Sequence, residues 1–494
     1  MNVLFVTPEA VPLAKTGGLA DVCGALPAAL AKEGHDVTVI LPFYRMCHNS
    51  GLPIRTKGVA LDIPTDQGLK KAEVVEARAG TPYQILLVEC DDYFNRPGLY
   101  VDPISGKDWP DNPQRFSLFA KTILRYFSGL CETPDVIHCH DWQAAFTLAF
   151  LARAATFEQT NAFSRTAKIF TIHNIGYPGL FSKDLLPAIG LPWDAFHIEE
   201  LEYYGKVNPL KGGIIYSDKV TTVSRRYSKE IMTPSFGMGL DGVLRKHAHK
   251  LHGILNGVDY TEWNPSTDPY IIRNYDPNNS SGKHDCKASI LEIFNIDLKY
   301  LVRPLIGTVG RLVDQKGFDI IADAMPELLA MDVSLVFLGA GDPKLEEKFR
   351  RIASDNPNRV GVEMGFDNSL AHRIEAGCDM FLMPSRYEPC GLNQMYSLKY
   401  GTIPIVHATG GLDDTIQHFS RETLQGNGFK FNEPTPQALI SAVAEAVEIY
   451  QIDALWNKLM ANAFMCDFSW RRSAREYLRL YREAIKGVRP ASDF

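Results

Sequence analysis

Lys15-Thr16-Gly17-Gly18-Leu19 follows a short apolar run, Val3-Leu4-Phe5-Val6, and precedes a stretch with helical periodicity. Two adjacent glycines between a strand and a helix let backbone N–H groups approach a ligand closely, because neither residue carries a Cβ. The start of a helix bears partial positive charge, which suits an anion such as a diphosphate, and Lys15 adds a full charge. Taken alone, the segment fits an anion-binding loop and a solvated turn equally well.

The residues around this segment predict a strand, a helix and a second strand. Apolar residues recur at helical spacing from Leu19 to Leu30, and Val37 to Leu41 form the next apolar run. Such a unit implies a parallel sheet with a right-handed crossover. Later apolar runs predict further strands at 85–88, 136–137, 169–172 and 219–223, and residues 91–113 predict a long loop of the kind that is often functional.

The second half repeats this rhythm after a change in composition. Residues 264–287 are rich in Asn, Asp and Pro, so we expect a domain boundary near Asn256. Strands are predicted at 305–309, 335–338, 380–383 and 403–406, and final helices at about 436–450 and 470–486. We therefore expect two doubly wound, Rossmann-like α/β domains, 1–255 and 256–470, facing each other across a deep cleft. The last helix, in 471–494, is expected to pack back on the N-terminal domain.

Composition limits the class of function. A net charge of −7 argues against general nucleic-acid binding, which needs a basic face. Nine scattered cysteines without a Cys-x-x-Cys pair indicate reduced thiols in a cytosol. The chain opens on a predicted strand rather than a secretory signal, and no apolar stretch reaches the roughly 18 residues that span a bilayer. We expect a cytoplasmic protein that binds neither nucleic acid nor membrane.

Histidines follow two predicted strands of the N-terminal half. His173 and Asn174 come directly after the run at 169–172, where an imidazole can donate a hydrogen bond to a sugar hydroxyl or to developing charge. A packed core histidine explains the same residue. His140-Asp141-Trp142 combines polar groups with an indole face, a common mixture in sugar sites.

A metal ion is the alternative for this second segment. The i, i+2 spacing of His138 and His140, with Asp141 beside them, permits a metal site, but no third ligand is implied, so we expect no metal here.

A cationic pair follows the first predicted strand of the second half. Arg311 and Lys316 lie five residues apart, at the end of a strand and the start of a helix. Arginine offers a bidentate fork to phosphate oxygens and lysine adds a mobile charge. Cations near a helix N-terminus oppose the helix dipole, and an anionic ligand would offset that cost. The pair therefore favours phosphate binding over a solvated helix start.

The segment Pro384-Ser385-Arg386-Tyr387-Glu388-Pro389-Cys390-Gly391-Leu392 is the other dense group of polar residues. The Glu388 carboxylate can accept hydrogen bonds from vicinal sugar hydroxyls, and the backbone N–H groups of Cys390 to Leu392 can hold a sugar or a diphosphate. No base is evident beside Cys390, so we do not expect covalent thiol chemistry.

Together these segments resemble the bacterial glycogen synthase and starch synthase family, which has the GT-B fold. The matching segments occur in the family's order and cover essentially the whole chain: Lys15 to Val22, His140 to Trp142, His173 to Tyr177, Asn256 to Asp259, Gly310-Arg311 with Lys316-Gly317, Pro384 to Leu392, and Thr409 to Leu412. The resemblance implies a retaining hexosyltransferase that moves glucose from ADP-glucose to the non-reducing end of an α-1,4-glucan and releases ADP. Its partners are then the nucleotide sugar and a glucan such as glycogen, with no metal or other cofactor.

The resemblance also implies roles for individual residues. Arg311 and Lys316 neutralise the leaving diphosphate, and His173 touches the transferring glucose. Lys15 and Gly18 contact the donor, Asn256 and Glu388 hold sugar hydroxyls, and Cys390, Gly391 and Leu392 supply backbone contacts. Asp21, Asp141 and Glu9 line the acceptor side. The further substrate-binding residues implied are Gly17, Trp142, Asn174, Phe366 and Asn393.

Two positions depart from the family pattern. Asn393 stands where the family commonly has threonine, which removes a hydroxyl that is expected to contact phosphate, although an amide can still donate. Phe366 stands where many relatives have tyrosine, so its ring can stack on adenine but has no polar tip.

Three alternatives remain open from the sequence. One is the same fold with UDP-glucose as donor. Another is an NAD-dependent dehydrogenase, although the usual Gly-x-Gly-x-x-Gly after the first strand is missing. The third is a non-catalytic, two-domain sugar-binding protein of the periplasmic type, against which the Arg311 and Lys316 pair counts.

Overall fold

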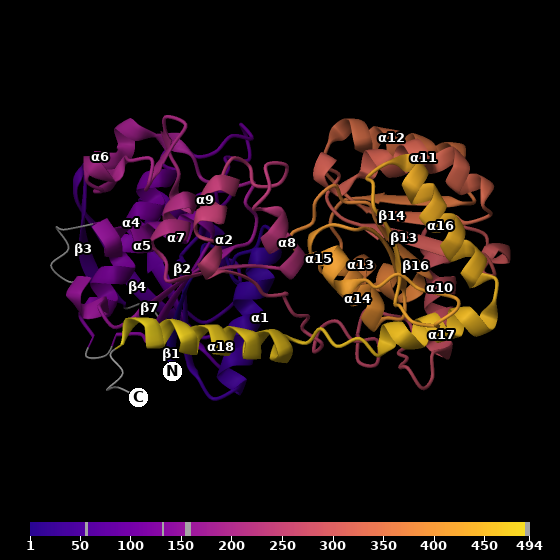
Figure 1. Ribbon diagram of the computed structural model, residues 1–494. Helices are drawn as coiled ribbons and strands as arrows, with labels where there is room; N and C mark the ends of the chain where they lie inside the picture. The colour runs from indigo at the N-terminus through magenta and orange to yellow at the C-terminus, as the bar shows by residue number, and fades with distance from the viewer. Residues whose placement is uncertain (55–57, 131–132, 154–159, 490–494) are drawn as a thin grey trace. The chain divides into compact units, whose positions relative to one another are not determined.

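The computed structural model describes residues 1–54, 58–130, 133–153 and 160–489. The chain forms two compact α/β units (Figure 1). Unit 1 comprises Met1–Val223, Ser228–Gly257 and Trp470–Phe494, and unit 2 comprises Ser224–Tyr227 and Val258–Ser469. Among the described residues, no helix combines the length and the apolar character that crossing a membrane requires.

Unit 1 is built on a nine-stranded sheet with the order β12-β11-β7-β6-β1-β2-β5-β4-β3. Neighbours from β12 to β5 pair in parallel, and β4 and β3 extend the sheet as an antiparallel hairpin. The strands are β1 (Asn2–Val6), β2 (Asp36–Pro42), β3 (Val59–Thr65), β4 (Gly68–Ala77), β5 (Gln84–Glu89), β6 (Val136–His140), β7 (Ala167–Ile172), β11 (Lys219–Thr222) and β12 (Leu251–Gly253). Three short strands, β8 (Phe181–Ser182), β9 (Glu202–Tyr203) and β10 (Lys206–Val207), form a separate small sheet.

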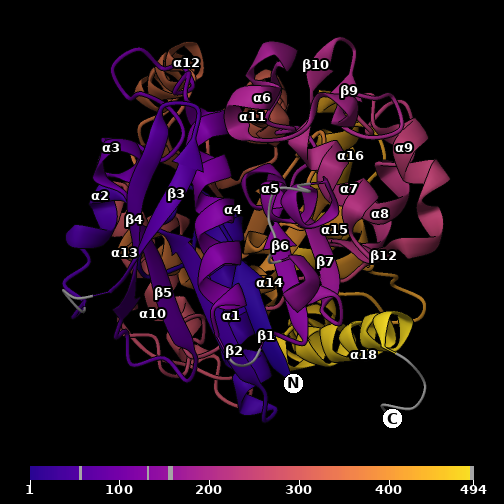
Figure 2. The same cartoon turned by 90° about the vertical axis from the view of Figure 1, so that its left-hand side faces the viewer.

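Helices pack against this sheet in two groups. In one group α5 contacts both α4 and α7, and in the other α1 lies beside α18 (Figure 2). The helices are α1 (Gly18–Lys32), α2 (Arg45–His48), α3 (Asp91–Phe94), α4 (Asn112–Ser128), α5 (Asp141–Arg153), α6 (Leu186–Ile189), α7 (Pro209–Tyr216), α9 (Asp241–Lys246) and α18 (Trp470–Val488). The helix α8 (Arg225–Glu230) begins in unit 2 and ends in unit 1. The loop predicted at 91–113 thus begins with the short helix α3 and ends as α4 starts.

The C-terminal helix α18 belongs to unit 1 because one of its faces is apolar. Trp470, Ala474, Tyr477 and Tyr481 recur at helical spacing and are buried, whereas the arginines between them face solvent. Ser473 Oγ also donates a hydrogen bond to the Leu255 carbonyl at 2.6 Å. These contacts tie the end of the chain to the first unit.

Unit 2 is built on a six-stranded parallel sheet with the order β15-β14-β13-β16-β17-β18. The strands are β13 (Leu305–Val309), β14 (Ser334–Gly339), β15 (Val360–Met364), β16 (Met380–Met383), β17 (Ile403–His407) and β18 (Phe429–Phe431). The helices are α10 (Ser281–Ile293), α11 (Phe318–Ala330), α12 (Pro343–Asp355), α13 (Asn368–Gly377), α14 (Asn393–Lys399), α15 (Gly410–Thr415), α16 (Pro436–Tyr450) and α17 (Asp453–Phe464). Their apolar faces and the strands form one continuous core.

Each sheet has a point at which the strand order reverses. In unit 1 the chain winds outward in opposite directions from β1 and β6, and in unit 2 it does so from β13 and β16. Ligands of doubly wound sheets bind beyond the carboxyl ends of the strands at such a point. We therefore expect the site residues in the segments that follow β1, β6 and β7 in unit 1, and β13 and β16 in unit 2.

Candidate functional site

The glycine loop after β1 ends at the first residue of α1. Gly17 is the N-cap residue with an extended backbone (φ −159°), and α1 begins at Gly18. A Cβ added to Gly17 would meet no atom within 4 Å, so the loop borders open space at this point. Lys15 Nζ donates to Asp21 Oδ1 at 2.7 Å, and burial raises the pKa of Asp21 despite that cation. Since this ion pair is exposed, it adds little stability.

Glu9 lies buried beneath the glycine loop and holds it in place. Its carboxylate accepts hydrogen bonds from the Thr16 hydroxyl and the Tyr100 hydroxyl, each at 2.6 Å, and from the Thr16 backbone N–H. Tyr100 lies 91 positions along the chain from Glu9. No feature of the sequence predicts this contact, which fixes the loop from below.

Three histidine rings lie against one another, tilted, near the carboxyl ends of β6 and β7. The rings of His138 and His140 lie 4.1 Å apart between centroids, and His140 Nδ1 lies 3.0 Å from His173 Nε2. Burial lowers the pKa of His173 to about 3 and holds the pKa of His140 well below its ordinary value. Burial also holds the pKa of His138 well below its ordinary value, so all three imidazoles are neutral at physiological pH. His173 can therefore present a neutral hydrogen-bonding group to a ligand.

Asp141 occupies a strained position at the first residue of α5, directly after β6. Its backbone is left-handed (φ 55°), a conformation that non-glycine residues seldom adopt and that is frequent at functional sites. Its Oδ1 accepts a hydrogen bond from the His173 backbone N–H at 2.8 Å. Burial raises the pKa of Asp141 to about 7, and the nearby Glu9 carboxylate adds to that increase. Asp141 therefore fixes the backbone that carries His173.

The neighbouring residues Trp142 and Asn174 are also held by local contacts. The Trp142 ring packs edge-on against Phe116, and a Cβ on Gly179 would lie 2.3 Å from it, so only glycine fits there. Asn174 Oδ1 accepts from the Gly176 backbone N–H at 2.9 Å. Both side chains help to shape the loop after β7.

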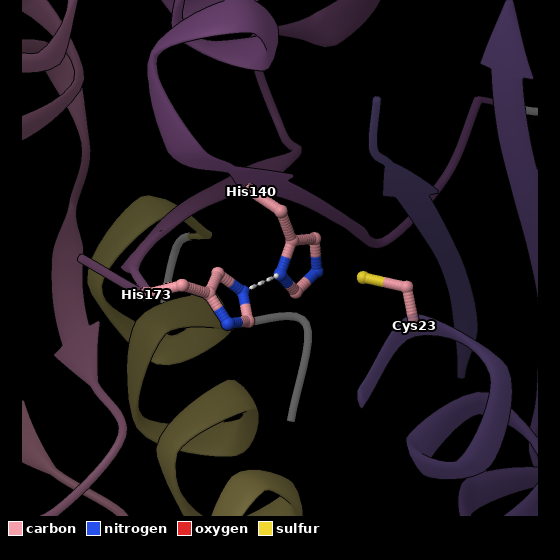
Figure 3. A group of neighbouring side chains, drawn as sticks. All are labelled: Cys23, His140 and His173. Atoms are coloured by element: carbon pink, nitrogen blue, oxygen red, sulfur yellow. Dashed lines mark hydrogen bonds between the residues drawn. The ribbon is translucent and has the colours of Figure 1, made fainter. Parts of the chain in front are cut away.

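The structure does not group His138, His140 and Asp141, the residues whose spacing permits a metal site, as the ligands of one ion. Both His138 nitrogens have hydroxyl partners, Tyr481 at 2.8 Å and Thr171 at 2.5 Å, so His138 is a structural residue. Among the described residues, the one set of three potential ligands is Cys23, His140 and His173, whose ligand atoms lie within 4.8 Å of one another (Figure 3). Cys23 comes from α1, which sequence spacing did not connect with the histidines.

In unit 2 the predicted cations follow β13. Arg311 is exposed and forms no ion pair with a carboxylate of the described residues. Lys316 ends a short 3₁₀ turn (Asp314–Lys316) just before α11, and its Nζ lies 2.6 Å from Glu388 Oε2. Ser385 Oγ donates to the same oxygen at 3.0 Å. The structure thus joins two of the predicted site residues that lie on opposite sides of the switch point.

Two glycines let the backbone after β17 pack directly on the Glu388 segment. A Cβ on Gly410 would lie 2.0 Å from the Glu388 carbonyl oxygen, and a Cβ on Gly411 would lie 1.9 Å from that of Cys390. Gly391 itself has a left-handed backbone (φ 72°) that favours glycine. The buried Cys390 thiol belongs to this packed turn, and Leu392 is the residue that precedes α14.

The three remaining predicted residues lie in different surroundings. Asn393 Nδ2 donates to the Val309 carbonyl at 2.9 Å, so this amide links α14 to the end of β13. The Phe366 ring is 88% exposed after β15, which leaves it open to stack on a planar ligand. Asn256 belongs to unit 1 and is buried, with no hydrogen-bond partner for its Oδ1 among the residues described here.

Two family models match the chain, one for each unit. Residues 2–246 match the model described as starch synthase catalytic domain, and residues 289–460 match glycosyl transferases group 1.

Individual proteins match over nearly the full length. A glycogen synthase of Koribacter versatilis is 45% identical over 486 residues, which cover 98% of both chains. A glycogen synthase of Pseudothermotoga lettingae is 43% identical over 493 residues, 98% of this chain and 99% of the relative. Among solved structures, the catalytic domain of starch synthase IV from Arabidopsis thaliana, bound to ADP and acarbose, superposes with a TM-score of 0.89 at 32% identity, covering 98% of this chain and 99% of that one.

Proposed function

Because the chain belongs to the glycogen synthase and starch synthase family of glycosyltransferases, we propose that it transfers glucose from ADP-glucose to the non-reducing end of an α-1,4-glucan. The reaction releases ADP and retains the configuration at glucose C1, so the new bond forms on the face from which the diphosphate leaves. The observation that carries the proposal is the full-length likeness to glycogen synthases, together with site segments at both switch points. The choice of an adenine nucleotide is supported by the ADP in the starch synthase structure.

The positive charges after β13 are assigned to the leaving diphosphate. Arg311 offers an exposed guanidinium whose fork matches two phosphate oxygens, and Lys316 adds a second cation five residues later. Groups aimed at charge that develops in the transition state are the largest single source of catalysis in many enzymes. We therefore assign to this pair the stabilisation of ADP as it departs. Phe366, whose ring is exposed, is assigned to adenine.

The sugar is assigned to His173 and Glu388. His173 is neutral and fixed by His140 and Asp141, so it can donate or accept one hydrogen bond at a glucose hydroxyl. Lys316 and Ser385 both donate to Glu388 Oε2. We assign the other carboxylate oxygen, Oε1, to the sugar hydroxyls. Backbone N–H groups of Cys390 to Leu392, and Asn256 and Asn393, complete the proposed donor contacts.

The loop after β1 is assigned to the space beside the donor. Gly17 and Gly18 leave room for the diphosphate-sugar, and Lys15 positions it. Asp21, Trp142 and Asn174 are proposed to face the glucan acceptor. Glu9 and Asp141 serve that side indirectly, since their carboxylates hold the backbone of Thr16 and His173.

We propose that transfer needs no metal ion, since arginine, lysine and helix N-termini supply positive charge to the diphosphate. Equal rates before and after treatment with a chelator would support this, and a loss that magnesium restores would contradict it. A cytoplasmic location is part of the proposal, supported by the eight described cysteines, none of which forms a disulfide with another described residue.

The direct test is ADP release from ADP-glucose and glycogen by the purified chain. The expected product is a glucan that is longer by α-1,4-linked glucose, with ADP in equal amount. The same assay with UDP-glucose decides the donor, and a rate higher than with ADP-glucose would overturn that part of the proposal.

A further inference from the structure

Cys23, His140 and His173 form a buried group that the proposed transfer does not use as a unit. Cys23 lies on α1, His140 ends β6, and His173 follows β7, so three separate elements bring these side chains together. Cys23 and His140 are fully buried and His173 is 8% exposed. One possible ligand atom from each lies within 4.8 Å of the other two.

The His140 imidazole is incompletely satisfied in this group. Its Nδ1 shares a hydrogen bond with His173 Nε2, whereas its Nε2 is buried and has no hydrogen-bond partner among the described residues. Figure 3 shows His140 between His173 and the Cys23 sulfur, with one ring nitrogen facing each neighbour. A buried polar atom without a partner is destabilising. This second observation indicates that the site has unused capacity for a ligand.

The thiol of Cys23 and the imidazoles of His140 and His173 indicate which ligand the site would bind. A thiolate and two neutral imidazoles are the donors that zinc and other thiophilic divalent cations prefer, and three protein ligands with an open fourth position are a common zinc arrangement. We propose that Cys23, His140 and His173 bind such a cation, and that the bound ion inhibits glucosyl transfer by withdrawing His173 from the sugar. The inhibition rests on the role proposed above for His173, whereas the binding does not.

The binding step requires small movements and the loss of one proton. Zinc–sulfur bonds of about 2.3 Å and zinc–nitrogen bonds of about 2.0 Å place tetrahedral ligand atoms about 3.5 Å apart. Since the three ligand atoms lie within 4.8 Å of one another, no pair has to close by more than about 1.3 Å. The hydrogen bond between His140 and His173 gives way to metal–nitrogen bonds. The Cys23 thiol releases its proton to solvent as the metal–sulfur bond forms, and water takes the fourth position. His173, the least buried of the three, marks the side of entry.

Cobalt(II) is the probe for binding, because a thiolate–cobalt bond gives a charge-transfer absorption in the near ultraviolet. We expect one cobalt ion per full-length, metal-stripped chain, with this band and the intense visible bands of a tetrahedral site. The Cys23→Ala variant should lose the charge-transfer band, while Cys47→Ala, which removes a buried thiol outside the group, should keep it. Absence of the band in the parent protein, or its persistence in Cys23→Ala, overturns the site.

Zinc titration of the transferase assay tests the inhibition separately. Zinc should inhibit the parent and Cys47→Ala alike, and Cys23→Ala should need at least tenfold more zinc while keeping the parent rate in its absence. Equal sensitivity of all three proteins overturns the inhibitory role. If no transfer from a nucleotide sugar is found at all, the proposed function fails, and the cobalt spectrum still decides the metal site.

Discussion

Lys316 Nζ and Glu388 Oε2 lie 2.6 Å apart, joining the segment after β13 to the segment after β16. The Glu388 side chain is 7% exposed, so its carboxylate depends on this cation and on the Ser385 hydroxyl for compensation. The lysine assigned to the diphosphate therefore also orients the carboxylate assigned to the sugar. A change at either residue should affect both parts of the proposed donor site.

Replacing Lys316 with alanine should lower both turnover and stability. Loss of one transition-state cation should reduce kcat/KM by about 10²–10³-fold. The melting temperature should also fall, since Glu388 is left buried without its cation. Lys344→Ala removes an exposed lysine from the first turn of α12 and should change neither quantity. A Lys316→Ala enzyme with the parent kcat/KM would contradict the assignment.

Arg311→Lys should separate charge from geometry. Lysine keeps the positive charge but loses the bidentate fork, and one charge-assisted hydrogen bond is worth about 1.5–3 kcal/mol, so kcat/KM should fall by at least roughly tenfold. The melting temperature should stay the same, because the guanidinium is exposed and pairs with no carboxylate of the described chain. An unchanged kcat/KM would show that Arg311 acts only as a point charge or not at all.

Gly17→Ala should reduce activity without reducing stability. The backbone at Gly17 is extended and open to any residue, and the new Cβ would touch nothing within 4 Å in the free protein. The methyl group would instead occupy space assigned to the donor, so KM for ADP-glucose should rise. Gly487→Ala, which adds a methyl group at another open position, is the control for activity. Full donor affinity in Gly17→Ala would remove this loop from the donor site.

Asp141→Asn should change how stability depends on pH. The pKa of Asp141 is raised to about 7, so the folded protein holds this proton more tightly than the unfolded chain does. The free energy of unfolding of the parent should thus fall as pH rises from about 4 to about 7, by at most about 1.4 kcal/mol per pH unit from this group. Asparagine tolerates the left-handed backbone and can still accept from the His173 N–H.

The measurement for this variant is a melting temperature at several pH values. The advantage of Asp141→Asn over the parent should grow between about pH 5 and about pH 7 and then level off. A constant difference across that range would mean that the carboxyl titrates normally.

Many strands and helices were predictable, because the hydrophobic pattern of a strongly periodic segment indicates its secondary structure without knowledge of its tertiary contacts. The parallel strands around β1 and β13 are short apolar runs, and their prediction is confirmed by the sheets. The helix predicted at 436–450 matches α16, because Thr435 caps it and Pro436 starts it. The hairpin of β3 and β4 was missed because β3 buries only one of its residues, so it has no apolar alternation.

The sequence predicts which segments form the candidate site, but it does not predict the contacts between them. Strand ends identified His173, Arg311 and Glu388 as candidates, since chain order places them beyond apolar runs. The ion pair of Lys316 with Glu388 spans 72 positions, and the support of Glu9 by Tyr100 spans 91. Such contacts depend on tertiary packing, which sequence spacing does not encode. For the same reason, the sequence does not predict that Cys23 lies beside His140 and His173.

The most direct test of the central claim is the rate of ADP release when ADP-glucose and glycogen are mixed with the purified chain. The account predicts release that requires both substrates, is faster than release of UDP from UDP-glucose, and falls sharply in Lys316→Ala but not in Lys344→Ala. Release no greater than in a blank without protein, from a folded and monodisperse sample, would contradict it.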